Sequence, residues 1–215
     1  MVGDVIVVEE HHRRAAEQIV KWLLPRISQT EGRFTLTVAG ESGSGKSETD
    51  QAIADALKAQ GITAGIYGQD DYFILPPKSN DAKRREDISW VGPQEVRLDL
   101  LDEHMQAARS GAESVNKPLV IYAEDKVTEE TMSLEGLEVV IAEGTYTTLL
   151  KNADARVFIN RNRLETLETR RKRGREPIEP FIEKVLEIEH EIISKHKELA
   201  DVVLSKDYEV ALPSA

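Results

Sequence analysis

The stretch Gly40-Glu41-Ser42-Gly43-Ser44-Gly45-Lys46-Ser47 fits the pattern G-x-x-x-x-G-K-[S/T], which forms phosphate-binding loops. Residues 34–39 before it are apolar and β-branched, and they predict a buried strand. Residues 47–60 after it carry apolar side chains at helical spacing. Glycines let backbone N–H groups turn inward around an anion, and the helix N-terminus adds partial positive charge. This context favours a phosphate cradle over a glycine- and serine-rich turn that matches by chance.

Two side chains of this loop have specific expected partners. Lys46 can reach the β- and γ-phosphates of a nucleotide, and the Ser47 hydroxyl can ligate Mg²⁺. The expected nucleotide-binding residues in and beside the loop are Gly40, Glu41, Ser42, Gly43, Ser44, Gly45, Lys46, Ser47 and Thr49.

The composition excludes several other classes of protein. The chain has 215 residues, enough for one domain with a sizeable core. Its net charge of −11 argues against nucleic acid or an anionic membrane as the main partner, because both require basic surface. It contains no cysteine, so disulfides and thiolate chemistry are excluded. No signal-peptide pattern and no apolar stretch of membrane-spanning length is present, so the cytoplasm is the expected location.

The N-terminal part predicts a helix in front of the phosphate-loop strand. Residues 11–27 carry apolar side chains at helical spacing, and residues 5–8 predict an edge strand or an ordered tail. His11 and His12 are adjacent and face different ways on a helix, which favours surface histidines over a metal site. We expect one domain over residues 1–215, with residues 1–32 as a helical extension. The sequence is compatible with a homo-oligomer but contains nothing that decides the oligomeric state.

Two carboxylates follow the second predicted strand, residues 61–68. Asp70 and Asp71 lie at its carboxyl end, where ligands bind in open α/β sheets. A carboxylate there can take a proton from a substrate hydroxyl or hold Mg²⁺ through water. An Asp-rich turn is the alternative, but the phosphate-loop pattern one strand earlier favours a functional role.

Residues 75–93 show no clear periodicity and predict a long loop, which inside a compact domain is typically functional. It could cover an acceptor substrate, with Trp90 as a stacking surface, or Trp90 could simply cap the core. The basic run at residues 83–85 is more often a solvated face than a site. The candidate acceptor contacts are Asp70, Tyr72, Trp90 and Arg84.

The second half predicts further strands and helices. Residues 93–109 predict a helix that ends at Gly111, and residues 117–122 and 126–134 predict a two-stranded ribbon. Further elements are a strand at 137–142, a strand at 155–159, a helix at 179–199 and a last strand at 200–204. Glu143 follows the first of these strands in the Walker B arrangement, where it would orient Mg²⁺ or its water shell. A plain acidic strand end is the alternative.

Residues 161–175 concentrate arginine and lysine in an otherwise acidic chain. Such a cluster favours a polyphosphate partner, with arginines folding over the transferring group. A solvated helix face that pairs with acidic neighbours is the alternative.

Residues 34–204 resemble the uridine kinase and phosphoribulokinase group of P-loop kinases. The matching features are residues 40–47, Gln69-Asp70-Asp71-Tyr72-Phe73, Ile141-Ala142-Glu143-Gly144, and Arg163-Leu164 leading to Arg173-Gly174-Arg175. The chain differs from uridine kinases at residues 89–95, where those enzymes carry an Asn-Phe-Asp-His-Pro-Asp-type segment.

The resemblance implies an α/β three-layer fold with a mostly parallel sheet and a basic helical lid. It implies ATP and Mg²⁺ as cofactors and transfer of the γ-phosphoryl group to a hydroxyl of a small molecule. That acceptor would be a nucleoside such as uridine, or a related sugar or alcohol. A regulatory ATPase that phosphorylates nothing is the alternative.

The resemblance also assigns roles to individual residues. The implied catalytic residues are Asp70, Lys46 and Arg173. The implied nucleotide contacts from the basic cluster are Arg170 and Arg175. The implied metal site consists of Ser47, Glu143 and Asp70.

Overall fold

The structure, a computed structural model, describes residues 6–167, 170 and 179–213. Its centre is a six-stranded sheet with the strand order β2-β5-β1-β6-β7-β8. The strands are β1 (Phe34–Gly40), β2 (Ala64–Gly68), β5 (Val139–Gly144), β6 (Ala155–Ile159), β7 (Val202–Leu204) and β8 (Val210–Ala211). The first five strands in the order run parallel, and β8 pairs antiparallel with β7. The sheet is therefore mostly parallel, as the sequence predicts.

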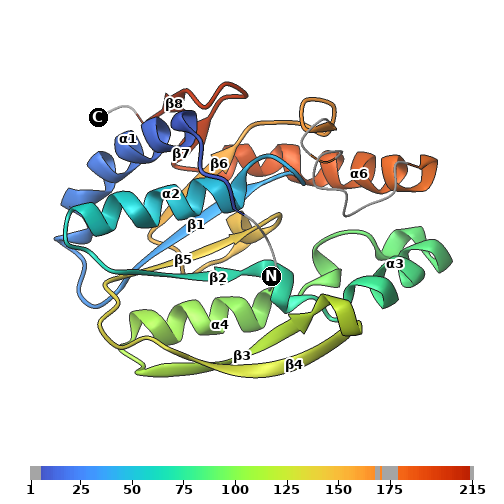
Figure 1. Cartoon of the computed structure of the whole chain (residues 1–215), viewed down its shortest axis with the longest axis horizontal. Helices are drawn as coiled ribbons and strands as arrows, with labels where there is room; N and C mark the ends of the chain where they lie inside the picture. Colours follow the sequence, from blue (N-terminus) through green and yellow to red (C-terminus); the bar gives the residue numbers. More distant parts are fainter. Residues whose placement is uncertain (1–5, 168–169, 171–178, 214–215) are drawn as a thin grey trace.

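Helices cover both faces of this sheet. The α-helices are α1 (Glu10–Ile27), α2 (Lys46–Ala59), α3 (Pro77–Glu86), α4 (Leu98–Arg109) and α6 (Pro180–Ile193). Figure 1 shows α1 and α2 on one side of the sheet and α4 on the other. Short 3₁₀ helices are η1 (Gln69–Tyr72), η2 (Ile88–Trp90), η3 (Pro93–Glu95), η4 (Tyr122–Glu124), η5 (Thr147–Leu149) and η6 (Ser194–Leu199).

Successive side chains of each strand point to opposite faces of the sheet, so the buried side chains form two core layers, one on each face. In β5, Val139 and Ile141 pack under α1 and α2, whereas Val140 and Ala142 face the layer that contains α4. Successive side chains of a strand point to opposite faces, so an uninterrupted apolar run is required when both faces are covered. The α/β three-layer fold expected from the sequence is confirmed.

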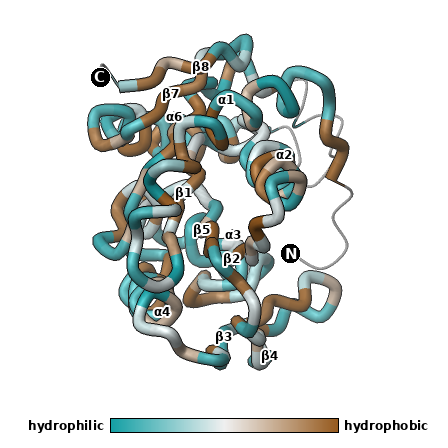
Figure 2. The backbone as a smooth tube through the Cα atoms, turned by 90° about the vertical axis from the view of Figure 1, so that its left-hand side faces the viewer, coloured by the Kyte–Doolittle hydropathy of each residue, from teal (hydrophilic) through white to brown (hydrophobic). Residues whose placement is uncertain are grey.

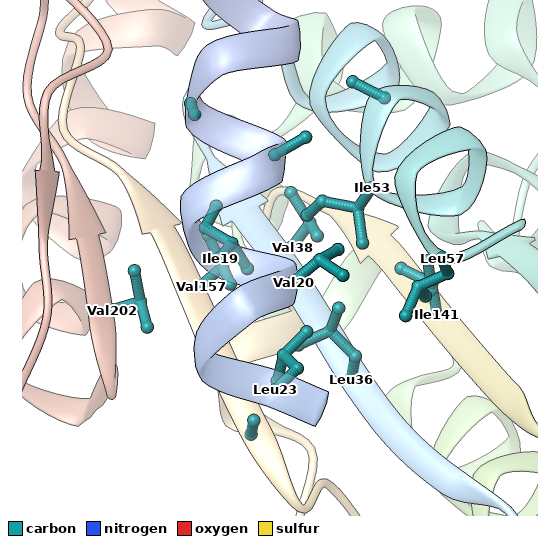
Figure 3. Packing of buried hydrophobic residues seen from close by; sticks show 14 of the residues in the cluster. Ile19, Val20, Leu23, Leu36, Val38, Ile53, Leu57, Ile141, Val157 and Val202 are labelled. Carbon is teal, nitrogen blue, oxygen red and sulfur yellow. The ribbon is translucent and has the colours of Figure 1, made fainter. Parts of the chain in front are cut away.

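The layer under α1 and α2 is closely packed. Figure 3 shows Leu23 of α1 beside Leu36 of β1, and Ile53 of α2 beside Val38 of β1. All four side chains are fully buried, and burial of one such side chain stabilises the fold by roughly 1.5–3 kcal/mol.

A separate antiparallel ribbon lies beyond the β2 edge of the sheet. It consists of β3 (Ser114–Ile121) and β4 (Lys126–Ser133), which pair along their whole length. Figure 2 shows this ribbon at the opposite end of the molecule from β7 and β8. The predicted two-stranded ribbon is confirmed.

Several predicted elements are corrected by the structure. Residues 75–93 are not a long loop, since they contain α3 and η2. The helix expected from Pro93 begins only at Leu98, after η3, and the helix expected over 179–199 ends at Ile193 and continues as η6. Of the edge strand or ordered tail expected at residues 5–8, the described residues 6–8 form no strand, and β8 follows the strand predicted to be the last. Among the described helices, none is long and apolar enough to cross a membrane.

Candidate active site

The phosphate loop connects the end of β1 to the start of α2. Gly43 and Gly45 have φ angles of +73° and +94°, in the left-handed region that favours glycine. A Cβ atom on Gly45 would also collide with the Tyr208 hydroxyl. Both requirements explain why the loop needs glycine at these positions.

Side chains from distant parts of the sequence hold the phosphate loop in place through hydrogen bonds and packing. The Tyr208 hydroxyl donates a 2.6 Å hydrogen bond to the Ser44 carbonyl, and Arg161 Nη1 donates to the Tyr208 oxygen at 3.1 Å. His12 packs edge-on against the Tyr208 ring and is only 5% exposed. The prediction that His12 is a surface residue is therefore wrong, because Tyr208 covers it.

Three further contacts hold the loop, two from its own end of α2 and one from α6. Thr49 Oγ1 donates to the Gly45 carbonyl at 2.7 Å, and Lys46 Nζ donates to the Glu41 carbonyl at 3.1 Å. The Glu41 carboxylate lies 2.6 Å from His190 Nδ1. The loop is thus tied to α6 as well as to α2.

Three acidic side chains, Glu143, Asp50 and Asp70, lie close enough together near the phosphate loop to affect one another's charge. Ser47 Oγ donates to Glu143 Oε1 at 3.4 Å. Burial raises the pKa of Glu143 to about 7, and nearby Asp70 adds to this rise while Lys46 opposes it. Burial likewise raises the pKa of Asp50 well above its usual value, and Glu143 adds to the effect. Within the described residues, Glu143 Oε2 and Asp50 Oδ1 are buried without a hydrogen-bond partner.

This arrangement fits a divalent cation. A cation would supply the charge that the buried acids lack, and Mg²⁺ is typically held by one or two carboxylates together with phosphates and water. The described residues contain no cluster of three or more His, Cys, Asp or Glu side chains that could hold a metal by themselves. Substrate phosphates and water would therefore have to complete the coordination.

A cavity of about 380 Å³ opens beside the phosphate loop. Ser42 and Gly43 of the loop line one part of it, and Asp70 and Thr145 lie at the carboxyl ends of β2 and β5. The remaining lining residues come mostly from the segment around α3 and from α6: Phe73, Leu75, Pro77, Lys78, Asn80, Asp81, Arg84, Tyr122, Arg170, Ile182, Val185, Leu186 and Glu189.

Asp70 is one of the acidic residues that line the cavity. It makes no hydrogen bond to any described residue, so its carboxylate oxygens are available to a ligand. Its neighbour Asp71 is buried and accepts hydrogen bonds from Lys117 and from the Val120 amide. The structure therefore separates these two carboxylates, one toward the cavity and one into the protein.

Arg84 lies at the centre of a buried ionic network in the cavity wall. Its Nε and Nη2 atoms lie 2.5 and 3.0 Å from the two Glu95 oxygens, and Nη2 lies 3.1 Å from Glu189 Oε1. Burial disfavours the charged guanidinium, but Glu189 and Glu95 outweigh it and raise the pKa of Arg84. The expectation that the basic run at 83–85 is only a solvated face is wrong for Arg84.

Two of the candidate acceptor contacts do not reach the cavity. Tyr72 is fully buried, and its hydroxyl lies 2.8 Å from His104 Nδ1. Trp90 donates through Nε1 to Asn80 Oδ1 at 2.9 Å and does not line the cavity. Of the four candidates, the structure brings Asp70 and Arg84 together.

The basic cluster is described only in part. Arg170 lines the cavity, and its Nη2 donates to the Arg163 carbonyl at 3.1 Å. Arg173 and Arg175, together with most of the expected lid, lie outside the described residues.

Sequence reasoning missed several residues of the site. They are Asn80, Glu95, Glu189, His190 and Tyr208. Each reaches the site through contacts between segments far apart in the chain. A helical carboxylate such as Glu189 gives no local signal of burial, because charged helix positions are usually exposed.

The three-layer fold and the phosphate loop between β1 and α2 define a P-loop protein. The model of the Phosphoribulokinase / Uridine kinase family matches residues 35–163, and the chain belongs to that family.

The individual relatives and solved structures share only a small fraction of identical residues with this chain. The bifunctional alpha-galactosidase/sucrose kinase AgaSK of Mediterraneibacter gnavus is 26% identical over 208 residues, which cover 90% of this chain. This chain spans only 22% of that relative's length. A uridine kinase of Bacillus cereus (strain B4264) is 25% identical over 187 residues, covering 81% of this chain and 86% of that enzyme. The phosphoribulokinase of Rhodobacter spheroides has a similar fold, with a TM-score of 0.64 at 11% identity, covering 82% of this chain and 71% of that one.

Proposed function

We propose that the protein is an ATP-dependent kinase that transfers the γ-phosphoryl group to a hydroxyl of a small molecule. The observation that carries this proposal is that one cavity contains both phosphate-loop residues and Asp70, whose carboxylate has no hydrogen-bond partner among the described residues. A donor phosphate on the loop and an acceptor hydroxyl on Asp70 would then share one enclosed space. Such proximity is the main requirement for phosphoryl transfer.

The loop would hold the nucleotide phosphates. In this scheme the backbone amides of residues 40–47 and the Lys46 ammonium bind the phosphate oxygens, while Thr49 keeps the Gly45 turn in shape. Ser47 and Glu143, with Asp70 nearby, are the residues that would hold Mg²⁺. Bound Mg²⁺ would offset negative charge on the β- and γ-phosphates.

Asp70 would act as the general base. The acceptor oxygen attacks the γ-phosphorus, its proton passes to Asp70, and the bond between the γ-phosphorus and the β–γ bridging oxygen breaks to release ADP. A positioned base typically contributes about 10²–10⁴-fold in rate. Arg170 lies where it could neutralise charge on the transferring group, and we assign the same task to Arg173 and Arg175 from the resemblance alone.

The relatives support this class of reaction and leave two kinds of acceptor. One relative is named a sucrose kinase and another a uridine kinase, so the acceptor is expected to be a sugar-like alcohol or a nucleoside. We further propose that residues 1–215 form one domain, because α1 contributes to the same hydrophobic core as α2 and the sheet. We also propose the cytoplasm as its location, on the sequence patterns alone.

Acceptor-dependent release of ADP tests the proposal. The purified chain should release ADP from ATP and Mg²⁺ when a suitable hydroxyl compound is added, and release should be negligible without one. A phosphorylated acceptor detected by ³¹P NMR would confirm transfer. Hydrolysis that is equally fast with and without every acceptor would contradict the proposal and favour the regulatory ATPase.

A further inference from the structure

Asp50 is a buried carboxylate at a position of α2 where the helical pattern calls for an apolar side chain. Asp50, Ile53 and Leu57 follow one another at helical spacing, so they lie on one face of α2, and all three are buried. Ile53 and Leu57 pack in the hydrophobic core on that face. Asp50 is only 2% exposed, and its Oδ1 has no hydrogen-bond partner among the described residues. Burial of such a group lowers the stability of the fold, which points to a role outside folding.

The Asp50 side chain is directed toward the residues that would hold Mg²⁺. Figure 3 shows Leu57, on the same face of α2 as Asp50, beside Ile141 of β5. Glu143 follows Ile141 by two residues and therefore points to the same side of the sheet. Burial raises the pKa of the Asp50 carboxyl, and Glu143 is the charged neighbour that adds most to this rise, while Lys46 opposes it. Asp50 thus lies near both Glu143 and Lys46.

From this placement we propose, resting on the proposed kinase function, that Asp50 is a positioning residue for Mg²⁺. Its carboxylate accepts a hydrogen bond from a water molecule bound to the ion and so helps to keep the ion at Ser47 and Glu143. Mg²⁺ usually retains several of its water ligands in proteins. Groups that orient the ligands of a metal typically change its affinity about 10–100-fold, although they do not touch the metal.

The donor set favours this indirect role over direct coordination. Among the described residues, no three His, Cys, Asp or Glu side chains are placed to hold a metal by themselves. Ser47 already contacts Glu143, at 3.4 Å between Oγ and Oε1. Asp50 is three residues after Ser47, about 4.5 Å further along the axis of α2. A water molecule between Asp50 and the ion suits this arrangement.

A purely structural role is the alternative for Asp50. A buried aspartate can carry a proton or bind a trapped water molecule and so help to hold a helix in place. The two roles differ in what removal of the charge does. If Asp50 acts on the metal, the metal-free protein should not need its charge, whereas a structural Asp50 should be needed with and without metal.

The variant Asp50→Asn tests the inference through nucleotide binding rather than turnover. The substitution removes the charge and retains the size of the side chain. Calorimetry of the intact chain gives the Kd for a non-hydrolysable ATP analogue in EDTA and in excess Mg²⁺, and the first value divided by the second is the Mg²⁺ effect. We expect Asp50→Asn to reduce the Mg²⁺ effect about tenfold. Its Kd in EDTA should be unchanged or lower, because a negative charge near the phosphate site is gone.

Asp55→Asn is the matched control. It removes the same charge from an exposed position of α2 and should leave both Kd values as in the wild type. Urea titration in EDTA provides a second readout, the free energy of unfolding without metal. Asp50→Asn should be at least as stable as the wild type, because it no longer buries an unpaired carboxylate.

The outcomes separate this inference from the proposed function. An equal Mg²⁺ effect in Asp50→Asn and in the wild type would overturn the inference and leave the kinase function standing. Lower stability or failure to fold of Asp50→Asn would also overturn it, as would equally weakened binding in Mg²⁺ and in EDTA, since these are the results of a structural role. Absence of analogue binding by the wild type would contradict the proposed kinase function and the inference with it.

Discussion

The Lys117 ammonium lies 2.8 Å from Asp71 Oδ2, and both side chains are buried. Lys117 also contacts Glu130 at 2.7 Å, and the Val120 amide donates to Asp71 Oδ1 at 3.1 Å. These contacts attach the β3–β4 ribbon to η1, the turn that carries Asp70. The adjacent residues Asp70 and Asp71 therefore have different roles. Asp71 holds the ribbon against η1, whereas Asp70 lines the cavity.

Removal of Lys117 should destabilise the protein. Lys117→Met leaves the buried Asp71 carboxylate without its cation, and loss of one partner from a buried pair typically costs about 3–5 kcal/mol. The free energy of unfolding from urea titration measures this change. Lys126→Met, at an exposed position of the same ribbon, is the control and should change stability little. Similar stability of both variants would mean that the buried pair does not hold the ribbon.

Tyr208 should contribute to nucleotide affinity without touching the nucleotide. Tyr208→Phe removes the hydrogen bond to the Ser44 carbonyl and so loosens the phosphate loop before ATP binds. One such hydrogen bond contributes about 1 kcal/mol, or about fivefold in affinity. Calorimetric titration with an ATP analogue checks this, and an unchanged Kd would show that the loop holds its shape without Tyr208.

The strands and the phosphate loop could be predicted because their signals are local. β1 and β5 are covered on both faces, so their sequences are continuous apolar runs, and fixed glycine spacing identified the loop between β1 and α2. The alternating pattern of residues 117–134 was enough for the ribbon. Each of these features is decided by neighbours in the chain.

The helix and the site residues that could not be predicted are held by contacts between residues far apart in the sequence. α3 has almost no apolar residues and thus no periodicity, and it is held instead by Asp125, which accepts from the Lys78 amide and from Ser79. Arg84 meets Glu189 across 105 positions of sequence. His12 is buried by Tyr208, which lies near the other end of the chain. No local pattern encodes such pairings.

Acid should destabilise the protein through His12. Burial lowers the pKa of His12 from 6.5 to about 4, and His11 adds to this shift. Between these two pH values the unfolded chain binds a proton that the folded chain does not, so stability is fully present above pH 6.5 and falls as the pH is lowered toward 4. The loss attributable to His12 should reach about 3 kcal/mol.

The variant His12→Gln isolates this contribution. Its unfolding free energy should depend less on pH between 4 and 6.5 than that of the wild type. Identical slopes for wild type and His12→Gln would contradict the buried, neutral state of His12.

Loss of Lys46 should abolish phosphoryl transfer and leave the fold intact. Its ammonium is held at the loop by the Glu41 carbonyl, within reach of bound phosphates, and does not take part in the hydrophobic core. Lys46→Ala is compared with Lys58→Ala, which removes the same charge from the exposed end of α2. Near wild-type turnover by Lys46→Ala, with an unchanged melting temperature, would show that the loop assignment is wrong.

The proposed role of Asp70 as general base is decided by the turnover number of Asp70→Asn, measured by acceptor-dependent ADP release beside the Kd for an ATP analogue. Asparagine keeps the shape of the side chain but cannot take the proton of the acceptor hydroxyl. We expect a fall in turnover of about 10²–10⁴-fold with nearly unchanged nucleotide affinity, and Asp71→Asn should instead lower stability more than turnover. Turnover of Asp70→Asn close to that of the wild type would show that Asp70 is not the general base.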